Sequence, residues 1–376
     1  MAKKAYVGVG GIARKIKKGY IGIGGKARKI KKAYIGVGGV ARPFWSGGNL
    51  AYYGKITALS AARQKLAATT VGNYALFGGG SANVVDAYDA SLTRTTPTTL
   101  SKSRFGLAAT TVGNCALFGG GYYNGGSNVV DAYDASLTRT TPTILSKSRS
   151  NLAATTVGNY ALFGGGGDGN GSVYDTVDAY NAGLTRTIPA ALSTGVSNLA
   201  ATTIGSYALF GGGAGNHETD QVIAYNTGLT KSTPTVLGAD RANLAATTVG
   251  NHALFGGGVT SDGTSVKGDV YVYDTNLTRT TGTSLSLGRF DMAATTIGDY
   301  ALFGGGARLD SSPILARVDI YDDKLVRSRM SQLESWVRNL AAATVGNFAL
   351  FGGGYGMKSE TSGTATQSIV TAYTLN

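Results

Sequence analysis

The sequence predicts an all-β fold made of seven copies of one strand-rich unit, and two observations carry this prediction. The first is the stretch LAATTVGNYALFGGG at residues 66–80, which returns six more times with small changes. The second is the spacing of the copies, 41 to 48 residues, which is typical of architectures whose repeat is one supersecondary element. The copies begin at Leu66, Leu107, Leu152, Leu199, Leu244, Met292 and Leu340.

The composition is that of a folded, β-rich chain. Glycine accounts for 58 of the 376 residues and charged residues for only 15%, while β-branched and aromatic residues are plentiful. The single cysteine, Cys115, excludes an internal disulfide framework and a cysteine-rich zinc site. Because no run of about 18 apolar residues occurs, we expect no membrane-spanning segment and no membrane partner.

Positive charge is concentrated at the start of the chain. The formal net charge is +13, yet residues 1–47 hold 12 of the 34 Lys and Arg residues and none of the 21 Asp and Glu residues. The other 22 basic and 21 acidic residues nearly balance. We therefore predict a basic segment of residues 1–47 and a repeat domain of residues 48–376, with the boundary at Gly47-Gly48.

The basic segment has its own repeat, with a period of 14 residues. AYVGVGGIARKIKK (residues 5–18) is followed by GYIGIGGKARKIKK (residues 19–32), and a third copy ends as ARPFWS (residues 41–46). Each copy has an apolar half, a Gly-Gly pair suited to a tight turn and a basic half, which predicts one small β-hairpin per copy. Isolated hairpins are marginal in water, so we expect them to need a partner or to self-assemble into a homo-oligomer.

Three functions compete for this basic segment. A secretory signal is rejected because the apolar stretches are short, broken by glycine and repeated, so we expect synthesis in the host cytoplasm without a signal peptide. Nucleic-acid binding is disfavoured because no recognition helix or base-stacking platform accompanies the cations. We favour a basic anchor that docks on a larger assembly. Its candidate contact residues are Lys17, Lys18, Arg28, Lys29, Lys31, Lys32, Phe44 and Trp45.

Each long repeat contains four strand-like pieces. In the first copy they cover residues 66–71, 74–77, 84–88 and 95–100, with a hairpin dipeptide, Gly-Asn, between the first two. Four short strands joined by turns form a propeller blade, and seven blades form a ring. The small residues of the first strand suit a crowded position near the ring axis.

A recurrent tyrosine and leucine predict the packing between blades. Tyr88 and Leu92 are four residues apart, so we place both on one face of the third strand. The chain ends predict how the ring closes, because the seventh copy stops at Asn376 after its third strand. A strand over residues 51–57 would complete this last blade and leave no open sheet edge.

These repeats resemble those of kelch-repeat β-propellers. The shared pattern is an apolar run into glycines, ALFGGG at residues 75–80, followed by Tyr88-Asp89, and this chain departs from it by placing Leu92 where a tryptophan is expected. Over residues 50–376 the resemblance implies an all-β, seven-bladed kelch-like β-propeller, closed by an N-terminal strand and preceded by the basic hairpins. Propellers host many functions, so the resemblance says little about activity.

No residue constellation points to an enzyme. Phosphate-binding glycine loops need a strand-to-helix turn, and no helix is expected after any GGG run, so we interpret these glycines as points of close backbone approach. Some kelch proteins are copper oxidases with clustered histidines, but only His217 and His252 occur here, at different positions of the repeat. Cys115 shares the strand position of His252 and is interpreted as packed. We expect no catalytic residue, no metal and no cofactor.

Two recurrent basic positions have a structural and a functional reading. The first follows Leu-Thr or Leu-Val, where we expect a solvated outer turn. The second precedes the first strand by three residues, where we favour a role in joining blades over a ring of positive charge at one mouth of the channel. The first set is Arg94, Arg139, Arg186, Lys231, Arg279 and Arg327, and the second is Arg63, Arg104, Arg149, Arg241 and Arg289.

The loops between the second and third strands differ most among the copies. From the last glycine of each triplet to the third-strand tyrosine, the spacing runs 8, 12, 14, 12, 15, 15 and 19 residues. Variable loops on a rigid scaffold usually carry binding, and the kelch resemblance implies that they share one face. The alternative is drift in loops that bind nothing. The candidate ligand-binding residues are Tyr122, Tyr123, Asn124, Asp168, Asn170, Tyr174, Asn216, His217, Glu218, Asp262, Arg308, Asp310, Tyr355 and Lys358.

The basic 14-residue repeat resembles the N-terminal repeats of minor structural proteins from bacteriophages and prophages of Gram-positive bacteria. This resemblance implies attachment to a virion. We therefore predict a non-enzymatic virion protein of the tail or capsid, anchored to other virion proteins through residues 1–47. Its propeller would bind a host-surface glycan or decorate the particle. The alternative is a free-standing lectin-like or protein-binding propeller.

Overall fold

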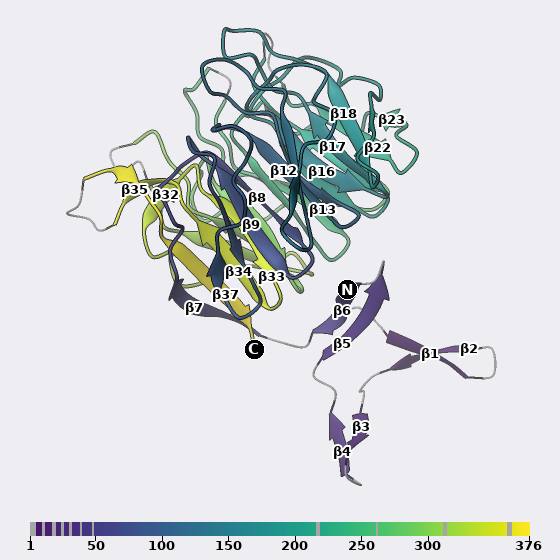
Figure 1. The fold of residues 1–376 in the computed structure, drawn as a ribbon. Coiled ribbons are helices and arrows are strands. Elements are labelled where there is room, and N and C mark those ends of the chain that lie inside the picture. The colour runs from purple at the N-terminus through teal and green to yellow at the C-terminus, as the bar shows by residue number, and fades with distance from the viewer. Residues whose placement is uncertain are drawn as a thin grey trace.

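The chain forms strands throughout the part that the structure describes. A computed structural model describes residues 5–376 except 10–11, 17–19, 24–25, 30–31, 38–39, 47–48, 216–218, 261, 311–313 and 359–362. These residues contain strands and no helix, and they build three two-stranded hairpins and seven four-stranded antiparallel sheets (Figure 1). The expected all-β fold of repeated four-stranded units is confirmed.

The N-terminal segment forms one hairpin per 14-residue copy, as its Gly-Gly pairs predict. The antiparallel pairs are β1 (Ala5–Val9) with β2 (Ile12–Ile16), β3 (Tyr20–Ile23) with β4 (Lys26–Lys29), and β5 (Lys32–Val37) with β6 (Val40–Ser46).

In the first six sheets the strands follow chain order. Sheets one to three are β8 (Leu66–Val71), β9 (Tyr74–Gly79), β10 (Val85–Tyr88) and β11 (Arg94–Thr95); β12 (Ala108–Val112), β13 (Cys115–Gly119), β14 (Val130–Asp134) and β15 (Arg139–Thr140); and β16 (Ala153–Val157), β17 (Tyr160–Gly164), β18 (Val177–Asn181) and β19 (Arg186–Thr187). Sheets four to six are β20 (Ala200–Ile204), β21 (Tyr207–Gly211), β22 (Val222–Asn226) and β23 (Lys231–Ser232); β24 (Ala245–Val249), β25 (His252–Gly256), β26 (Val270–Tyr273) and β27 (Arg279–Gly282); and β28 (Ala293–Ile297), β29 (Tyr300–Gly304), β30 (Val318–Asp322) and β31 (Arg327–Arg329).

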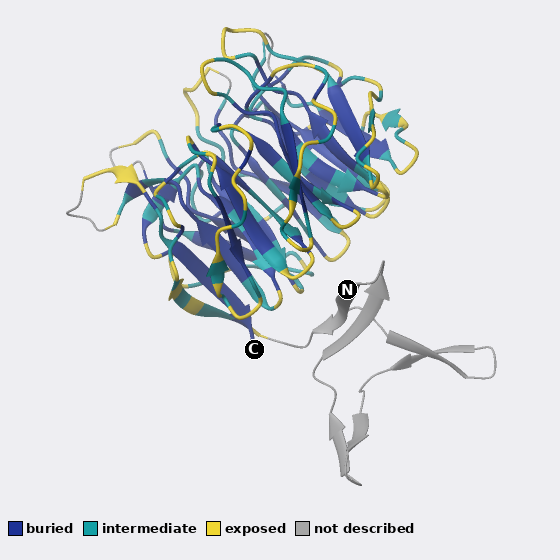
Figure 2. Ribbon diagram, in the orientation of Figure 1, coloured by how far each residue is buried: buried dark blue, intermediate teal, exposed yellow. Residues whose placement is uncertain are grey.

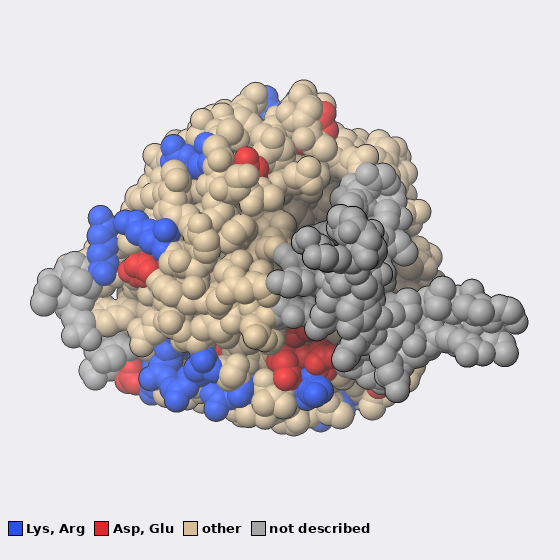
Figure 3. Space-filling view, turned by 90° about the horizontal axis from the view of Figure 1, so that it is seen from below, with Lys and Arg blue, Asp and Glu red and all other residues tan. Residues whose placement is uncertain are grey.

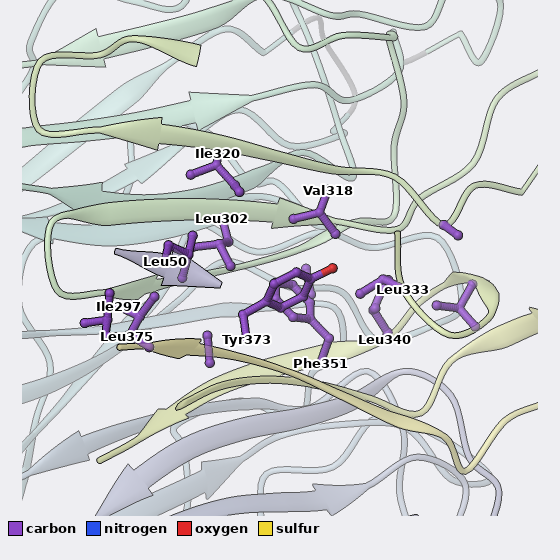
Figure 4. Close-up of a cluster of buried hydrophobic side chains, with 14 residues drawn as sticks. Leu50, Ile297, Leu302, Val318, Ile320, Leu333, Leu340, Phe351, Tyr373 and Leu375 are labelled. Carbon is purple, nitrogen blue, oxygen red and sulfur yellow. The ribbon is translucent and has the colours of Figure 1, made fainter. Parts of the chain in front are cut away.

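The seventh sheet combines the two ends of the repeat region. It consists of β33 (Ala341–Val345), β34 (Phe348–Gly352), β37 (Val370–Leu375) and β7 (Leu50–Ile56), so the expected N-terminal strand does pair with the last strand of the chain. Leu50 packs beside Leu375 and Ile297 in the apolar layer between the sixth and seventh sheets (Figure 4). A small extra sheet, β32 (Trp336–Arg338), β35 (Tyr355–Met357) and β36 (Ala365–Thr366), lies outside this pattern.

The innermost strands contact one another from sheet to sheet, including β33 of the seventh sheet with β8 of the first. Just before each innermost strand, one residue donates its backbone N–H to the carbonyl of the equivalent residue in the preceding sheet, over 2.7 to 3.0 Å. The donors are Lys65, Gly106, Asn151, Asn198, Asn243, Asp291 and Asn339, and the acceptor of Lys65 is Asn339. These seven hydrogen bonds therefore form an unbroken ring.

Neighbouring sheets interlock through a phenylalanine, a glycine and a tyrosine. The Phe118 ring packs where a Cβ on Gly78 of the preceding sheet would lie only 2.7 Å away, so this position cannot carry a side chain without displacing the ring. Phe118 also meets Tyr133 edge-on, with ring centroids 5.9 Å apart. The buried Tyr133 hydroxyl donates to the Thr98 carbonyl, just beyond the outermost strand of the preceding sheet, at 2.8 Å. The glycines thus make room for aromatic rings.

Buried ion pairs tie the linkers to the third strands. In the second sheet, Arg104 and Asp131 are both 0% exposed, and Arg104 Nη2 donates to Asp131 Oδ2 at 2.7 Å and to the Phe118 carbonyl at 3.1 Å. Arg149–Asp178 and Arg289–Asp319 repeat this ion pair, again at 2.7 Å. Burial lowers the pKa of Arg104, and Asp131 opposes that shift. These contacts tie each linker to the sheet that follows it, and burial excludes these arginines from a charged ring at the channel mouth.

Sheets that lack the arginine also lack the aspartate. In the fourth sheet the two positions hold Val196 and Ile223, both buried, and in the seventh they hold Val337 and Thr371. In the fifth sheet Arg241 is kept, but its guanidinium lies 4.7 Å from the ring centroid of Tyr271. Because an isolated buried charge is costly, each sheet carries the pair, a substitute partner for the cation, or no charge at all.

Two of the sequence-based expectations are wrong in detail. Leu92 does not lie on the third strand, which ends at Tyr88; it sits in a turn with a left-handed backbone, φ 62°, and packs against the core from there. The turn forms because Asp89 Oδ1 accepts hydrogen bonds from the N–H groups of Ser91 and Thr93. The fourth strand is also shorter than expected, since β11 covers only two residues.

The outer arginines are not freely solvated. Arg139 is only 25% exposed and donates to Asp131 Oδ1 at 2.9 Å, while Arg94 donates to the Ala58 carbonyl at 2.7 Å. The expected solvated position is therefore wrong for both: Arg139 bonds within its own sheet, and Arg94 bonds the segment that follows β7 of the seventh sheet. On the side of the molecule shown in Figure 3, most of the described surface is uncharged, with Lys and Arg gathered toward its edge.

Threonine hydroxyls join the innermost strands at six of the seven junctions. Examples are Thr110 Oγ1 with Thr156 Oγ1, 2.8 Å apart, and Thr295 Oγ1 with Thr344 Oγ1, 3.0 Å apart. At the junction of the seventh and first sheets the equivalent position holds Ala343, which is buried and carries no hydroxyl to face Thr70.

Substituting Ala343→Thr should stabilise the fold. The new hydroxyl would reproduce a hydrogen bond found at the other junctions, a gain of about 0.5–1.5 kcal/mol in the free energy of unfolding. Urea denaturation of the variant would measure the gain, with Thr247→Ala as the matched control that should lose a similar amount. A destabilised Ala343→Thr protein would mean that this junction lacks room for the extra atoms.

Candidate functional site

The variable loops begin beside the ring of seven hydrogen-bonded residues. In most sheets the residue preceding the ring position pairs with the first residue of that sheet's loop, as Ser150 does with Gly167 and Phe290 with Ala307. In the seventh sheet the same place holds the ladder of β32 and β35. The loops therefore leave the sheets at the end where the ring lies, and the exposed loops of this end are visible in Figure 2.

The seven ring positions share a left-handed backbone, with φ from 52° at Lys65 to 63° at Gly106. This conformation is easy for glycine, tolerable for asparagine and aspartate, and unfavourable for longer side chains. It lets each residue donate its N–H to one neighbour and offer its carbonyl to the next, so the backbone closes the ring. The side chains of these seven residues are not needed for this hydrogen bonding and can line a cavity.

These side chains surround a cavity of about 670 Å³, which we call the axial cup. Its wall is formed by the seven ring residues together with Gln64 and Arg338. Its apolar part is formed by the first residues of the repeats, Leu66, Leu107, Leu152, Leu199, Leu244, Met292 and Leu340. A cavity of this size, with apolar residues and a few convergent polar groups, is typical of small-molecule sites.

Charge is unevenly distributed around the axial cup. Lys65, Asp291 and Arg338 lie in the part contributed by the first, sixth and seventh sheets, whereas Asn151, Asn198 and Asn243 line the remainder. Arg338 Nη1 lies 3.9 Å from Asp291 Oδ2. Burial raises the pKa of Asp291, and Arg338, Lys65 and a hydrogen bond with Asn339 act in the opposite direction.

Some predicted binding residues support the loops through packing. Tyr122 stacks on Phe105, with ring centroids 5.5 Å apart, and also lies against Gly169 of the next loop. The Lys147 ammonium lies over the Tyr174 ring, 4.7 Å from the ring centroid, in a cation–π contact. Tyr355 lies beside a residue of the cup wall, since its ring centroid is 5.8 Å from the Arg338 guanidinium, and its hydroxyl lies 3.0 Å from that of Thr364.

Other predicted residues are exposed along the loops. Tyr123 is 60% exposed, and Asn124 and Lys358 are also exposed. Asp168 and Asp262 organise their own loops, where hydrogen bonds from Asn170 and from Thr260 and Thr264 lower the pKa values of these carboxyls. The ion pair Arg308–Asp310, at 2.6 Å, also stays within one loop. The predicted loop residues that the structure describes are thus spread over several sheets and do not form one compact cluster.

Part of the predicted set lies outside the described residues or is described only as backbone. Asn216, His217 and Glu218 lie outside, as do Lys17, Lys18 and Lys31 of the anchor. Arg28 and Lys29 lie on β4, Lys32 on β5, and Phe44 and Trp45 on β6.

Metal-binding clusters and membrane-spanning helices are both absent from the described part of the chain. No group of three or more His, Cys, Asp or Glu residues there is arranged to hold a metal ion. No helix in that part is long and apolar enough to span a membrane. Cys115 begins β13 and His252 begins β25, so both occupy the strand position expected for them, and Cys115 is partly buried against its sheet's core.

The axial cup was missed in the sequence although a signal for it was present. The position before each LAATT copy reads Lys, Gly, Asn, Asn, Asn, Asp and Asn, which is the residue preference of a left-handed backbone. A polar residue that recurs beside the first strand in six of the seven repeats indicates a polar lining.

Comparison with known proteins gives a similarity in fold and none in sequence family. No protein-family profile matches the sequence, and no curated protein matches it. A solved structure described as "Structure of YjhT" is similar over 73% of this chain and 99% of its own, with a TM-score of 0.59 and 11% sequence identity. The chain is an all-β protein of repeated four-stranded sheets, compatible with a β-propeller. At this identity the likeness concerns the fold alone, and function must be argued from the site.

Proposed function

We propose that residues 50–376 form a closed, seven-bladed, kelch-like propeller that serves as a non-enzymatic binding or decoration module. The unbroken ring of seven backbone hydrogen bonds supports closure, because a gap between the first and seventh sheets would interrupt it. The pairing of β7 with β37 supports it at the outer edge. Each sheet is then one blade, and the axial cup lies at one mouth of the central channel.

One observation carries the functional proposal. The variable loops and the point where the basic segment joins the repeat region lie at opposite ends of the sheets. Asn49, which follows the basic segment, accepts a hydrogen bond from Asn376 at 3.1 Å, and Leu375 bonds the Asn347 carbonyl in the turn after the innermost strand. Figure 1 shows β35, within a variable loop, and the C-terminus at opposite ends of the seventh sheet. A protein anchored through residues 1–47 would therefore present its loops and axial cup away from the anchor.

We further propose that the anchored partner is a phage particle of a Gram-positive host, in its tail or capsid. This step rests on the resemblance of the basic 14-residue repeat to those of phage and prophage minor structural proteins. The displayed face would bind a host-surface glycan or only decorate the particle. The second candidate is a free-standing lectin-like or protein-binding propeller, favoured by the existence of a polar cup that needs no anchor to bind a ligand.

Co-sedimentation of two proteins, the full chain and residues 48–376, tests this proposal. We expect the full chain to sediment with particles from the bacterial host and residues 48–376 to remain in solution, because only the full chain has the anchor. Both should bind host cell envelope if the displayed face is adhesive. Presence in particles without envelope binding would favour decoration, whereas equal glycan binding and no particle binding would favour the free-standing lectin.

A further inference from the structure

The axial cup is a half-open cavity of small-molecule size whose wall carries a set of amides. Asn151, Asn198 and Asn243 approach the axis from three successive blades, and each amide offers both donors and an acceptor. A Cβ at Gly106 would lie 2.6 Å from Asn151 Oδ1, so this amide extends over the glycine position. Groups that can both donate and accept, arranged around one cavity of about 670 Å³, suit a ligand rich in hydroxyl groups.

The charged part of the cup has one more cation than anion. Two cations, Lys65 and Arg338, share the single carboxylate of Asp291. The Arg338 guanidinium lies 3.9 Å from the Asp291 carboxylate. The buried Nε of Arg338 has no hydrogen-bond partner. Lys65 is exposed, and its ammonium lies 5.9 Å from the Phe105 ring centroid. A ligand with one negative charge would neutralise this excess.

Lys65 also stands at a position that does not favour lysine. Its φ of 52° is shared by ring residues that are otherwise glycine, asparagine or aspartate. Long, unbranched charged side chains are uncommon in this conformation, which asparagine, aspartate and glycine adopt more readily. Since asparagine occupies four of the seven ring positions, the fold does not require a lysine here, and its cation is the property that asparagine would not supply.

We propose that the axial cup binds an acidic sugar unit, a polyhydroxylated group bearing one carboxylate or phosphate. Lys65 and Arg338 would meet the acidic group, the asparagines would bond the hydroxyls, and the leucines would contact the apolar face of the ring. Charge-assisted hydrogen bonds are about twice as strong as neutral ones, so the acidic group would supply the selectivity. The inference rests on the proposed function and specifies its ligand.

Ligand-detected NMR titration of the full chain with glucuronic acid, glucose 6-phosphate and glucose tests the inference. We expect an acidic sugar to bind more tightly than glucose, and comparison of the two acids separates a carboxylate from a phosphate ligand. Lys65→Asn should weaken binding of the preferred acid about tenfold without changing glucose, since it removes a charge-assisted contact. Asp291→Asn should tighten the acid. Lys55→Asn, at an exposed position of β7, is the control and should change neither.

Three results would overturn the inference: equal binding of glucose and both acids, no binding of any of them, or full acid binding by Lys65→Asn. The proposed function can fail separately. If the wild-type chain adheres to host envelope and Lys65→Asn adheres equally well, adhesion stands and the cup is not its site. If the acid binds in the cup but neither particle nor envelope is bound, the ligand assignment stands and the virion role fails.

Discussion

Substituting Asp131→Ala should destabilise the protein by about 3–5 kcal/mol, because it leaves the Arg104 guanidinium buried without its counter-ion. Both side chains are 0% exposed, so water cannot take over the lost contact. The same substitution removes the acceptor of Arg139 and of the Ser101 N–H. Urea denaturation followed by tryptophan fluorescence and circular dichroism would measure the loss as a lower midpoint.

The chain provides its own matched control in the fourth sheet. Replacing the pair with the residues found there, in the double variant R104V/D131I, should recover most of the stability lost in Asp131→Ala. Val196 and Ile223 show that this site can be filled without charge, and apolar replacement of buried ion pairs is often neutral or stabilising. If the double variant were as unstable as Asp131→Ala, the hydrogen bonds of Arg104 to the strand backbone, rather than charge balance, would hold the blade.

The sequence predicts the repeated architecture well because the same packing constraints act in every repeat. The hairpin dipeptide, the Phe and the glycines each occupy one structural position seven times, so sequence similarity alone reveals four-stranded units. The pairing of β7 with β37 could be predicted because the missing strand of the last repeat has a visible counterpart at residues 51–57. Leu92 was misplaced because an Asp-initiated turn ends the strand earlier than side-chain spacing suggests.

The candidate site was harder to predict because it depends on how the repeats meet. Lys65 and Asp291 are 226 positions apart in sequence (65 to 291), and both line the cup only because backbone hydrogen bonds link the repeats at this position. The buried arginines were similarly ambiguous, since their partners lie on another strand and the pairing shows only when both positions are compared across repeats. The third-strand position is the charged Asp131 in the second sheet and the apolar Ile223 in the fourth. The linker position changes with it, from Arg104 to Val196.

Removal of residues 1–57 should open the ring, whereas removal of residues 1–47 should leave its stability unchanged. The longer deletion takes away β7, exposes the backbone of β37 and removes the Thr57 carbonyl that accepts the Tyr88 hydroxyl at 2.8 Å. It also removes Leu50 from the core and Tyr52 from its edge-on contact with Tyr373. The loss of buried apolar surface from these two side chains alone amounts to about 3–6 kcal/mol, at roughly 1.5–3 kcal/mol per large side chain.

Thermal melting and sedimentation of residues 58–376 beside residues 48–376 would measure the effect. We expect the shorter protein to melt at a lower temperature and to associate, because an unpaired strand such as β37 is a template for pairing with another chain. A synthetic peptide of residues 48–57 should raise the melting temperature by supplying the missing strand in trans. Equal melting of the two proteins would mean that the ring is held at the axis by its seven hydrogen bonds and does not need closure at its outer edge.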